Sequence, residues 1–296
     1  MQTKCLLCGN KQKLKVMYPA TITKANRQVE IWSARRSPDK IHFRIVECQR
    51  CGMIFSCPIW PAKMIAKLYS QASCSYAEQV PYAAETYWQL FKQYRHFLPK
   101  KPVVLEVGCG SGWFLEKLAN KGITQVCGVE PGKGMIDQAP AWLKRRIKAD
   151  VFRPEMWSKN KFDAVLCFHA LDHMVSPMTF VKEAYRLLKP GGVVLVVVHD
   201  TQGISVKLWG EASPIFDIEH VYLFNKRTLN ELFVRCKFIK VQVTNLINTY
   251  PLAYWLQMSG LPKALKRLLR ITAQAFGGTN LPVSLPGGNI VLVAWK

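Results

Sequence analysis

The chain has 296 residues, of which 49% are hydrophobic and 20% are charged, and it carries a formal net charge of +22. This composition excludes a disordered chain, and no stretch reaches the roughly 18 apolar residues that a membrane-spanning helix needs. The length suits one large domain with a smaller one. The first residues, Met1 to Cys5, contain no apolar signal core, so we expect a cytoplasmic protein.

The positive charge predicts an anionic partner, which is nucleic acid, a phosphorylated substrate or a membrane surface. A general basic bias that serves solubility is an equally good interpretation. The excess is uneven, because residues 1–62 carry 11 Lys and Arg against 3 Asp and Glu. Residues 251–296 carry 5 Lys and Arg and no acidic residue.

Two motifs near the N-terminus each place two cysteines three positions apart, followed by a glycine. They are Cys5-Leu-Leu-Cys8-Gly9 and Cys48-Gln-Arg-Cys51-Gly52. Two such turns supply four thiolates, the ligand set of a structural zinc site. Alternating apolar residues between them predict a β-rich zinc ribbon over residues 1–62, whose zinc stabilises the fold. Four reduced thiols without metal are the alternative, and Cys57 and Cys74 are expected to be structural.

A second pattern joins a buried strand, Val103–Val107, to a helix that begins near Trp113 through Gly108, Gly110 and Gly112. Such a turn brings backbone N–H groups close to a ligand. A dinucleotide fingerprint would need a glycine where Trp113 stands, so NAD is disfavoured. Glu130 ends the next strand, where a carboxylate accepts hydrogen bonds from both ribose hydroxyls of a nucleotide-like cofactor.

These segments resemble the class I S-adenosylmethionine-dependent methyltransferases. Five motifs occur in that family's order: Glu106–Gly112, Gly128–Pro131, Ala149–Val151, Phe162–Pro177 and Arg186–Gly192. The resemblance implies that Glu106 orients the cofactor amino group and that Asp150 contacts the adenine amino group. The implied cofactor-binding residues are Glu106, Gly108, Cys109, Gly110, Gly112, Glu130, Pro131, Asp150, Val151 and His169.

The resemblance implies a Rossmann-like α/β methyltransferase fold, with a mostly parallel seven-stranded sheet whose last strand is antiparallel. Strands are expected near residues 103–107, 124–129, 163–168, 193–199, 238–244 and 290–295, with a helix over 178–188. We expect a zinc ribbon over 1–62, a helical lead-in or lid over 63–100 and a cofactor-binding core over 101–250. A C-terminal cover over 251–288 and a final core strand over 289–296 complete the chain.

Two cysteine motifs before this core are also similar to a bacterial arrangement found in sugar C-methyltransferases of biosynthetic clusters. The segment Glu219–Asn225 resembles that group's conserved stretch before a helix, with Asn225 in place of the usual Ser or Thr. Asn225 is expected to cap a helix that begins near Lys226.

Methyl transfer to oxygen or carbon requires a base that removes a proton from the acceptor. His173 is the first candidate, and His220 and Tyr222 are the second. A structural hydrogen-bonding role is an equally good interpretation for each histidine. His42, His96 and His199 are expected only to fill core or surface.

Residues 261–276 have the spacing of an amphipathic helix with Lys263, Lys266, Arg267 and Arg270 on one face. Docking on the core is the plainer interpretation, and contact with anionic lipid or a lipid-linked phosphate is the sharper one. We expect a methyltransferase that acts on a sugar, lipid-linked or secondary-metabolite acceptor, with peripheral membrane contact through 261–276. The alternatives are an RNA methyltransferase that holds RNA on the ribbon and basic surface, and a non-catalytic interaction module.

Overall fold

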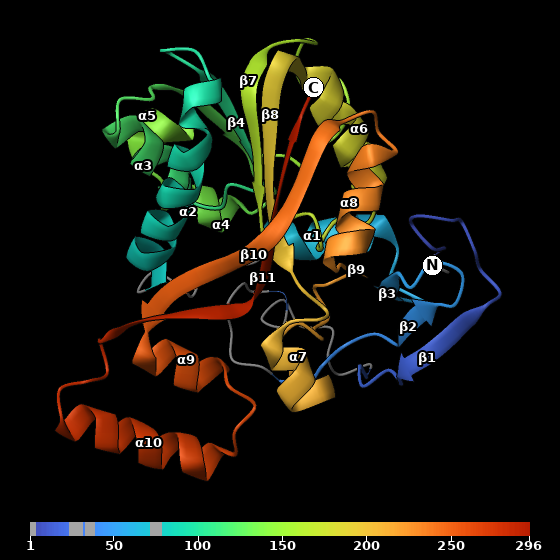
Figure 1. The fold of residues 1–296 in the computed structure, drawn as a ribbon, viewed down its shortest axis with the longest axis vertical. Coiled ribbons are helices and arrows are strands. Elements are labelled where there is room, and N and C mark those ends of the chain that lie inside the picture. The colour runs from blue at the N-terminus through green and yellow to red at the C-terminus, as the bar shows by residue number, and fades with distance from the viewer. Residues whose placement is uncertain (1–3, 24–31, 33–38, 72–78) are drawn as a thin grey trace.

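The computed structural model describes residues 4–23, 32, 39–71 and 79–296. A seven-stranded sheet forms the centre of the molecule (Figure 1). The strand order is β10-β11-β8-β7-β4-β5-β6, and β11 runs antiparallel to both of its neighbours. The other paired strands, β8, β7, β4, β5 and β6, run parallel to one another. This order confirms the Rossmann-like fold with its antiparallel strand at the end of the chain. The strands are β4 (Val103–Val107), β5 (Gln125–Val129), β6 (Ile147–Lys148), β7 (Phe162–Phe168), β8 (Leu188–His199), β10 (Ile239–Pro251) and β11 (Pro282–Trp295).

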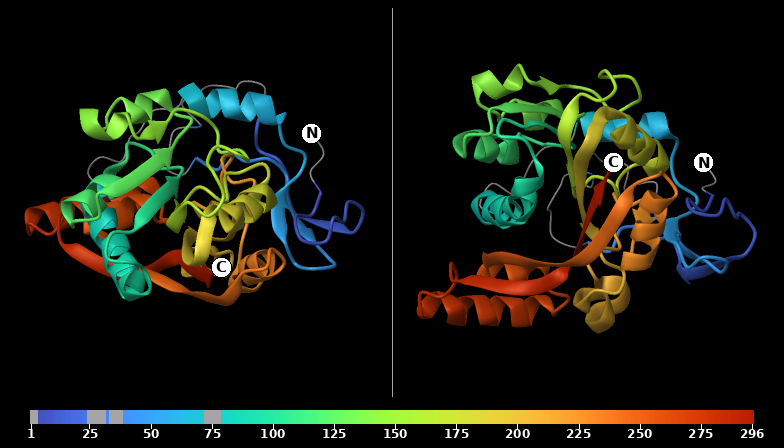
Figure 2. Two further views of the ribbon diagram at one scale, coloured as in Figure 1. Left: turned by 90° about the horizontal axis from the view of Figure 1, so that it is seen from above. Right: turned by 45° about the horizontal axis from the view of Figure 1, so that its top comes forward.

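Helices cover both faces of this sheet (Figure 2), which explains why its central strands read as continuous apolar runs. Alternate residues of β8 enter two separate cores: Val193 and Leu195 pack with α2 and α3, whereas Val194 and Val196 pack with α6 and α8. The longer helices are α1 (Ala62–Gln71), α2 (Val80–Tyr94), α3 (Trp113–Asn120), α6 (Pro177–Leu187), α8 (Lys226–Val234) and α10 (Lys263–Ala275). The shorter ones are η4 (Arg95–Phe97), α4 (Lys133–Ile136), α5 (Ala141–Lys144), α7 (Ile204–Trp209), η5 (Gly210–Ala212) and α9 (Leu252–Met258).

Two of the sequence motifs meet at the base of the sheet. The Asp163 carboxylate accepts hydrogen bonds from Lys189 Nζ at 2.9 and 3.0 Å and from the backbone N–H of Val103 at 2.8 Å. The contact joins the beginning of β4 to β7 and β8, so this ion pair fixes how the three central strands align.

Helix boundaries follow local capping signals. The helix expected over 178–188 is α6, and the helix expected from Lys226 is α8. Asn225 caps α8 as predicted, because its side chain accepts from Thr228 N at 2.9 Å while Thr228 Oγ1 accepts from Asn225 N at 3.0 Å. This reciprocal pair is a capping box, and it fixes the direction in which the preceding segment enters the helix.

The C-terminal strands are longer than expected. β10 continues to Pro251 and β11 begins at Pro282, because the two strands pair with each other beyond the edge of the sheet, as far as Pro251 opposite Pro282. β11 pairs with β8 only from Asn289 onward. The hairpin therefore extends away from the sheet and carries α9 and α10 at its tip (Figure 1).

A second, smaller sheet contains β1 (Leu14–Tyr18), β2 (Ile45–Cys48), β3 (Ile54–Ser56) and β9 (Tyr222–Leu223), all antiparallel. Its last strand comes from the later part of the chain. Ile54 pairs with Leu223 and Phe55 with Tyr222. The N-terminal segment is thus hydrogen-bonded to the loop that follows β8. Cys74, which was expected to be structural, lies outside the described residues. Among the described residues, no helix is both long and apolar enough to cross a membrane.

Candidate active site

A cavity of about 630 Å³ opens at the carboxyl ends of the parallel strands, the edge at which open α/β sheets bind ligands. The turns after β4, β5 and β7 form one part of its wall, and His199 at the end of β8 forms another. Further parts of the wall come from α1, α2 and α9, from the loop that carries His220, and from the β10–β11 hairpin. The cavity therefore lies between the ligand edge of the central sheet and the helices and loops that cover that edge.

The glycine turn after β4 requires glycine at two positions. Gly108 has φ +73°, and a Cβ atom there would lie 2.5 Å from the Cβ of Ala170. Gly112 has φ +74°, and its added Cβ would lie 2.6 Å from Leu143 Cδ2. Both the left-handed backbone and the close approach exclude larger residues. Gly108, Cys109 and Gly110 line the cavity, so the turn presents its backbone to a ligand.

Two carboxylates stand beside this turn. Glu130 accepts hydrogen bonds from the backbone N–H groups of Gly110 at 3.0 Å and of Gly132 at 2.8 Å. Burial nevertheless raises the pKa of Glu130. The carboxylate is thus held at the end of β5, where sequence reasoning placed the ribose-binding acid.

Glu106 is 3% exposed, and its Oε2 atom has no hydrogen-bond partner among the residues that the structure describes. Burial, followed by the charge of Glu130, raises the pKa of Glu106 well above its usual value. A buried acceptor without a donor is costly. A cationic ammonium group bound in the cavity would satisfy it, and S-adenosylmethionine carries such a group on its methionine end, so the residues present fit this cofactor.

The structure brings most of the predicted cofactor residues together. Those lining the cavity are Glu106, Gly108, Cys109, Gly110, Glu130, Pro131, Val151 and His169. Gly112 and Asp150 do not line it. Gly112 is the N-cap residue of α3. The half-exposed Asp150 carboxylate accepts a hydrogen bond from Arg153 Nε at 3.2 Å.

Three histidine rings surround one buried aspartate on the acceptor side of the cavity. The His220 ring lies 4.8 Å from that of His173 and 4.6 Å from that of His199. Asp172 Oδ2 accepts a hydrogen bond from His199 Nδ1 at 2.7 Å, and Asp172 is 1% exposed. Burial alone would raise the pKa of Asp172, but the hydrogen bond and charge of His199 hold it well below its usual value. Asp172 is therefore an ionised group that orients His199.

Sequence reasoning missed the role of His199, which it assigned to core or surface filling. The available signal was its position, since His199 is the last residue of a central parallel strand and therefore points to the ligand edge of the sheet. Its contact with Asp172 depends on folding, because the two residues lie on different strand ends.

His220 has a fixed tautomer. Its Nδ1–H donates to the carbonyl oxygen of Ile215 at 2.8 Å, which leaves Nε2 as the nitrogen that carries a lone pair. Burial, reinforced by the charges of His199 and His173, lowers the pKa of His220 well below 6.5. His220 is thus neutral at physiological pH and lines the cavity, so the lone pair on Nε2 is available to accept a proton.

The other two candidate bases are placed differently. His173 lines the cavity, and its Nδ1 lies 2.9 Å from the hydroxyl of Tyr69. Tyr222 does not occur among the described residues that line the cavity. Its hydroxyl donates to the carbonyl oxygen of Lys4 at 3.3 Å, and burial raises its pKa to about 12. Catalysis by Tyr222 stays a prediction that this geometry does not favour.

The four N-terminal cysteines form a second cluster, separate from the cavity. Their sulfur atoms all lie within 4.8 Å of one another, with 3.3 Å between Cys5 and Cys51 and 3.5 Å between Cys8 and Cys48. Zinc–sulfur bonds of about 2.3 Å in a tetrahedron require sulfur separations of this order. Burial is outweighed by hydrogen bonds from Asn10 and the backbone, which lower the pKa of Cys48 to about 6, and this favours the thiolate. Burial raises the pKa of Cys5 and raises that of Cys51 to about 11, so these thiols would lose their protons on binding the metal. The donor set fits zinc.

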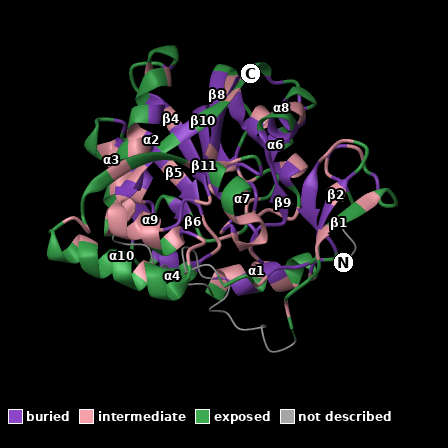
Figure 3. Ribbon diagram, turned by 60° about the horizontal axis from the view of Figure 1, so that its bottom comes forward, coloured by how far each residue is buried: buried purple, intermediate pink, exposed green. Residues whose placement is uncertain are grey.

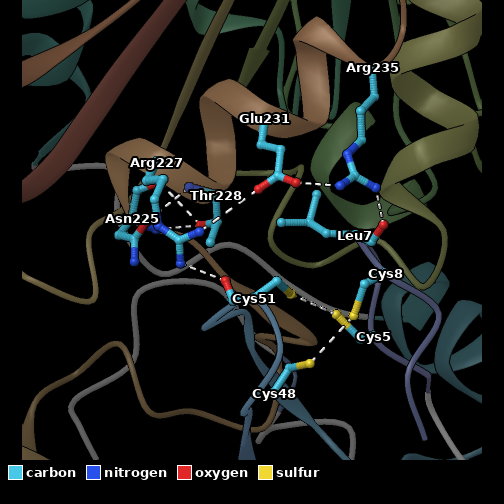
Figure 4. Close-up of polar contacts among 10 residues, drawn as sticks. All are labelled: Cys5, Leu7, Cys8, Cys48, Cys51, Asn225, Arg227, Thr228, Glu231 and Arg235. Carbon is cyan, nitrogen blue, oxygen red and sulfur yellow. Dashed lines mark hydrogen bonds and ion pairs between the residues drawn. The ribbon is translucent and has the colours of Figure 1, made fainter.

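Helix α8 holds both cysteine turns from outside (Figure 4). Arg227 donates to the carbonyl oxygen of Cys51, and Arg235 donates to that of Leu7. Glu231 lies between the two arginines and pairs with both. These hydrogen bonds therefore attach the cysteine cluster to α8, a helix that packs on the large sheet.

Comparison with known proteins identifies the region around the cavity. A family model described as "Methyltransferase domain" matches residues 76–242, which is more than half of the chain. Among curated relatives, the ubiquinone biosynthesis O-methyltransferase of Pseudomonas entomophila is 34% identical over 99 residues, covering 31% of this chain and 41% of the relative. The tRNA U34 carboxymethyltransferase of Idiomarina loihiensis is 32% identical over 118 residues, or 36% of each chain.

The similarity is confined to the shared core, because the chain spans less than half of the length of these relatives. Among solved structures, the YcgJ protein of Bacillus subtilis aligns with a TM-score of 0.51 at 18% identity, covering 72% of this chain and 98% of that one. This likeness concerns the fold alone.

Proposed function

The chain belongs to the methyltransferase-domain family, and from that premise we propose that it moves a methyl group to an oxygen or carbon atom of a small-molecule acceptor. It is an S-adenosylmethionine-dependent methyltransferase. The observation that carries the finer proposal is the position of His220. This neutral, buried base lines the same cavity as the glycine turn and Glu106.

The cofactor end of the cavity supplies recognition. S-adenosylmethionine provides an activated methyl electrophile, so the protein's task is to align the acceptor with it and exclude water. We assign the orphaned Glu106 carboxylate to the cofactor ammonium group and Glu130 to its ribose hydroxyls. Glu106 is buried within β4, and Glu130 accepts hydrogen bonds from two backbone N–H groups at the end of β5, so both carboxylates are in place before the ligand binds.

The histidine cluster supplies proton transfer. With the cofactor bound, His220 Nε2 would accept the proton that the acceptor oxygen or carbon gives up when it takes the methyl group. Burial keeps the ring neutral beforehand, and the hydrogen bond from Nδ1 to Ile215 places the lone pair on Nε2. The ionised Asp172, which is hydrogen-bonded to His199, stabilises the positive charge that develops on the His220 ring.

The acceptor end of the cavity is bounded by aromatic and apolar side chains. Tyr250, Tyr254, Trp255 and Met258 line it from the β10–β11 hairpin and α9. Aromatic faces pack against sugar rings and planar metabolites, and the cavity volume lies in the range of small-molecule sites. We therefore favour a sugar, lipid-linked or secondary-metabolite acceptor.

We further propose that one structural zinc ion binds Cys5, Cys8, Cys48 and Cys51. All four thiols are used, so no position remains open for a substrate. The ion would stabilise the small sheet and take no part in the transfer.

The first test separates cofactor binding from catalysis. We expect S-adenosylhomocysteine to bind with micromolar affinity by calorimetry, and NAD to show no heat. Glu106→Gln removes the negative partner of the ammonium group at nearly constant volume and should weaken binding at least tenfold. Equal affinity in both proteins would remove Glu106 from the site.

The second test concerns the base. His220→Asn keeps an amide that can donate to Ile215, and the variant should bind S-adenosylhomocysteine normally. It should no longer form S-adenosylhomocysteine as a product when it is assayed with sugar, quinol and phenol acceptors. His96→Asn, at an exposed position, is the matched control. Full turnover by His220→Asn with an acceptor that the native protein methylates would overturn the assignment.

RNA methylation is the second candidate, and the net charge of +22 favours it. Binding that depends on phosphate contacts weakens steeply as salt rises. The test is binding of a labelled tRNA pool at several salt concentrations. Measurable affinity that falls by orders of magnitude between low and physiological salt would support an RNA substrate. No binding at physiological salt would exclude this hypothesis.

A further inference from the structure

Helix α10 leaves its apolar side uncovered. None of its residues is buried, and Leu268 is 60% and Ile271 55% exposed. Phe276, directly after the helix, is 87% exposed. Figure 3 shows the helix as an exposed segment beside the more buried α9. The expected plain docking of this helix on the core therefore does not account for its apolar residues.

The polar side of α10 carries several basic residues and no acidic one. Lys263, Arg267 and Arg270 are exposed on the face opposite Leu265 and Leu268. From Leu232 to Lys296 the chain carries no Asp or Glu. A helix with an exposed apolar face, a cationic opposite face and no acidic residue matches a helix that lies in the plane of an anionic bilayer.

The position of α10 suits such contact. The β10–β11 hairpin carries it beyond the edge of the sheet (Figures 1 and 2), and Lys266 Nζ donates to the carbonyl oxygen of Gln257 at 2.8 Å. That bond ties one flank of α10 to the end of α9, while the apolar side stays outward. The helix is thus anchored to the protein by its flank.

We propose that α10 binds the surface of an anionic phospholipid membrane, with its apolar residues at the level of the acyl boundary and its lysines and arginines at the phosphates. α9, which contacts α10, lines the cavity through Tyr254 and Trp255. Membrane binding therefore places the acceptor wall of the cavity next to the lipid surface. This inference does not depend on which atom is methylated.

The test is flotation of the full chain with vesicles. We expect binding to vesicles of phosphatidylcholine with phosphatidylglycerol and much weaker binding to phosphatidylcholine alone. The variant K263Q/R267Q/R270Q should lower the partition coefficient by about a hundredfold at low salt. The matched control K100Q/K101Q/R145Q removes the same charge from exposed sites elsewhere and should leave binding nearly unchanged.

A second pair of variants tests the apolar side of α10. L268Q/F276Q should abolish vesicle binding, whereas L208Q/V234Q, at positions 64% and 53% exposed, should retain it. Calorimetry with S-adenosylhomocysteine verifies that every variant is folded. Equal loss in test and control variants would overturn the proposal, as would vesicle binding that does not require anionic lipid. Self-association that L268Q/F276Q abolishes, without any vesicle binding, would assign the apolar face to a second copy of the chain instead.

Discussion

The hydroxyl of Ser56 donates a hydrogen bond to the carbonyl oxygen of His220 at 2.9 Å. Ser56 ends the last N-terminal strand, β3, and its N–H also donates to Val221 at 2.9 Å. On the other side, Val221 N donates to the carbonyl oxygen of Asp172. The segment that carries the proposed base is thus held between the small sheet and the loop after β7.

Ser56→Ala should therefore lower turnover while leaving cofactor affinity unchanged. The variant loses one buried hydrogen bond, which contributes about 1 kcal/mol to stability, and leaves the carbonyl of His220 without that donor. We expect kcat to fall several-fold with little change in the affinity for S-adenosylhomocysteine. Ser56→Thr keeps the hydroxyl and should restore kcat, and failure of that rescue would mean that Ser56 does not position His220.

Removing the metal should act on the same segment. Zinc analysis should find about one ion per chain, and Cys48→Ser should lose it. We expect the loss to raise amide hydrogen exchange in β3 and in β9, because these strands pair directly. Cys57→Ser is the matched control, since Cys57 is buried but lies outside the four-cysteine cluster. Unchanged exchange at β9 in a zinc-free protein would show that the two segments are not coupled.

The fold was largely predictable because its signals are local. Continuous apolar runs marked β7 and β8, and Asn225 marked the beginning of α8. The pairing of β9 with β3 was not predictable, because a two-residue strand has no periodicity and its partner lies more than 160 positions away. The length of the β10–β11 hairpin was missed for a related reason, since its outer half is stabilised by cross-strand pairs and by no sheet neighbour.

The site divides in the same way. The glycine turn, Glu106 and Glu130 follow a strand within a few residues, so spacing alone located them. His199 was missed because its contact with Asp172 joins the ends of two strands that are adjacent only in the folded sheet. Tyr222 was grouped with His220 because both were expected in the long loop after the Val193–Val198 strand. The structure instead places Tyr222 in β9, where its ring packs against Phe55 and its hydroxyl donates to the carbonyl oxygen of Lys4.

The stability of the ligand-free protein should depend on pH through Glu106. Its pKa is raised in the folded state by burial and by Glu130. The unfolded chain therefore ionises first, and stability falls as pH rises from the usual value of about 4.5 toward the raised folded value. Glu106→Gln removes this loss. Its melting temperature should exceed that of the native protein by more at pH 8 than at pH 5, and an equal difference at both pH values would contradict the assignment.

The His220 ring should stay neutral at pH values below the usual histidine pKa of 6.5. Its pKa is lowered by burial and by the neighbouring histidines, so the acid limb of kcat/KM should lie below pH 6.5. The same shift predicts that stability falls as pH drops below 6.5, because the unfolded chain then binds the extra proton. Nitrogen NMR of labelled histidine should show a neutral ring with the proton on Nδ1 at pH 6.5. A protonated ring at that pH would exclude His220 as the base.

Gly108→Ala tests whether the turn itself binds the cofactor. The substitution combines a left-handed backbone, which costs about 1–2 kcal/mol for other residues, with a contact of 2.5 Å to Ala170 Cβ. Gly191→Ala is the control for the first effect, because Gly191 has φ +76° and open space around its added Cβ. We expect both variants to lose stability and Gly108→Ala alone to lose S-adenosylhomocysteine binding. Adding Ala170→Gly should restore part of that binding, since it removes the contact and leaves only the backbone strain. No recovery would mean that the turn's conformation, and not its contact with Ala170, controls the cofactor site.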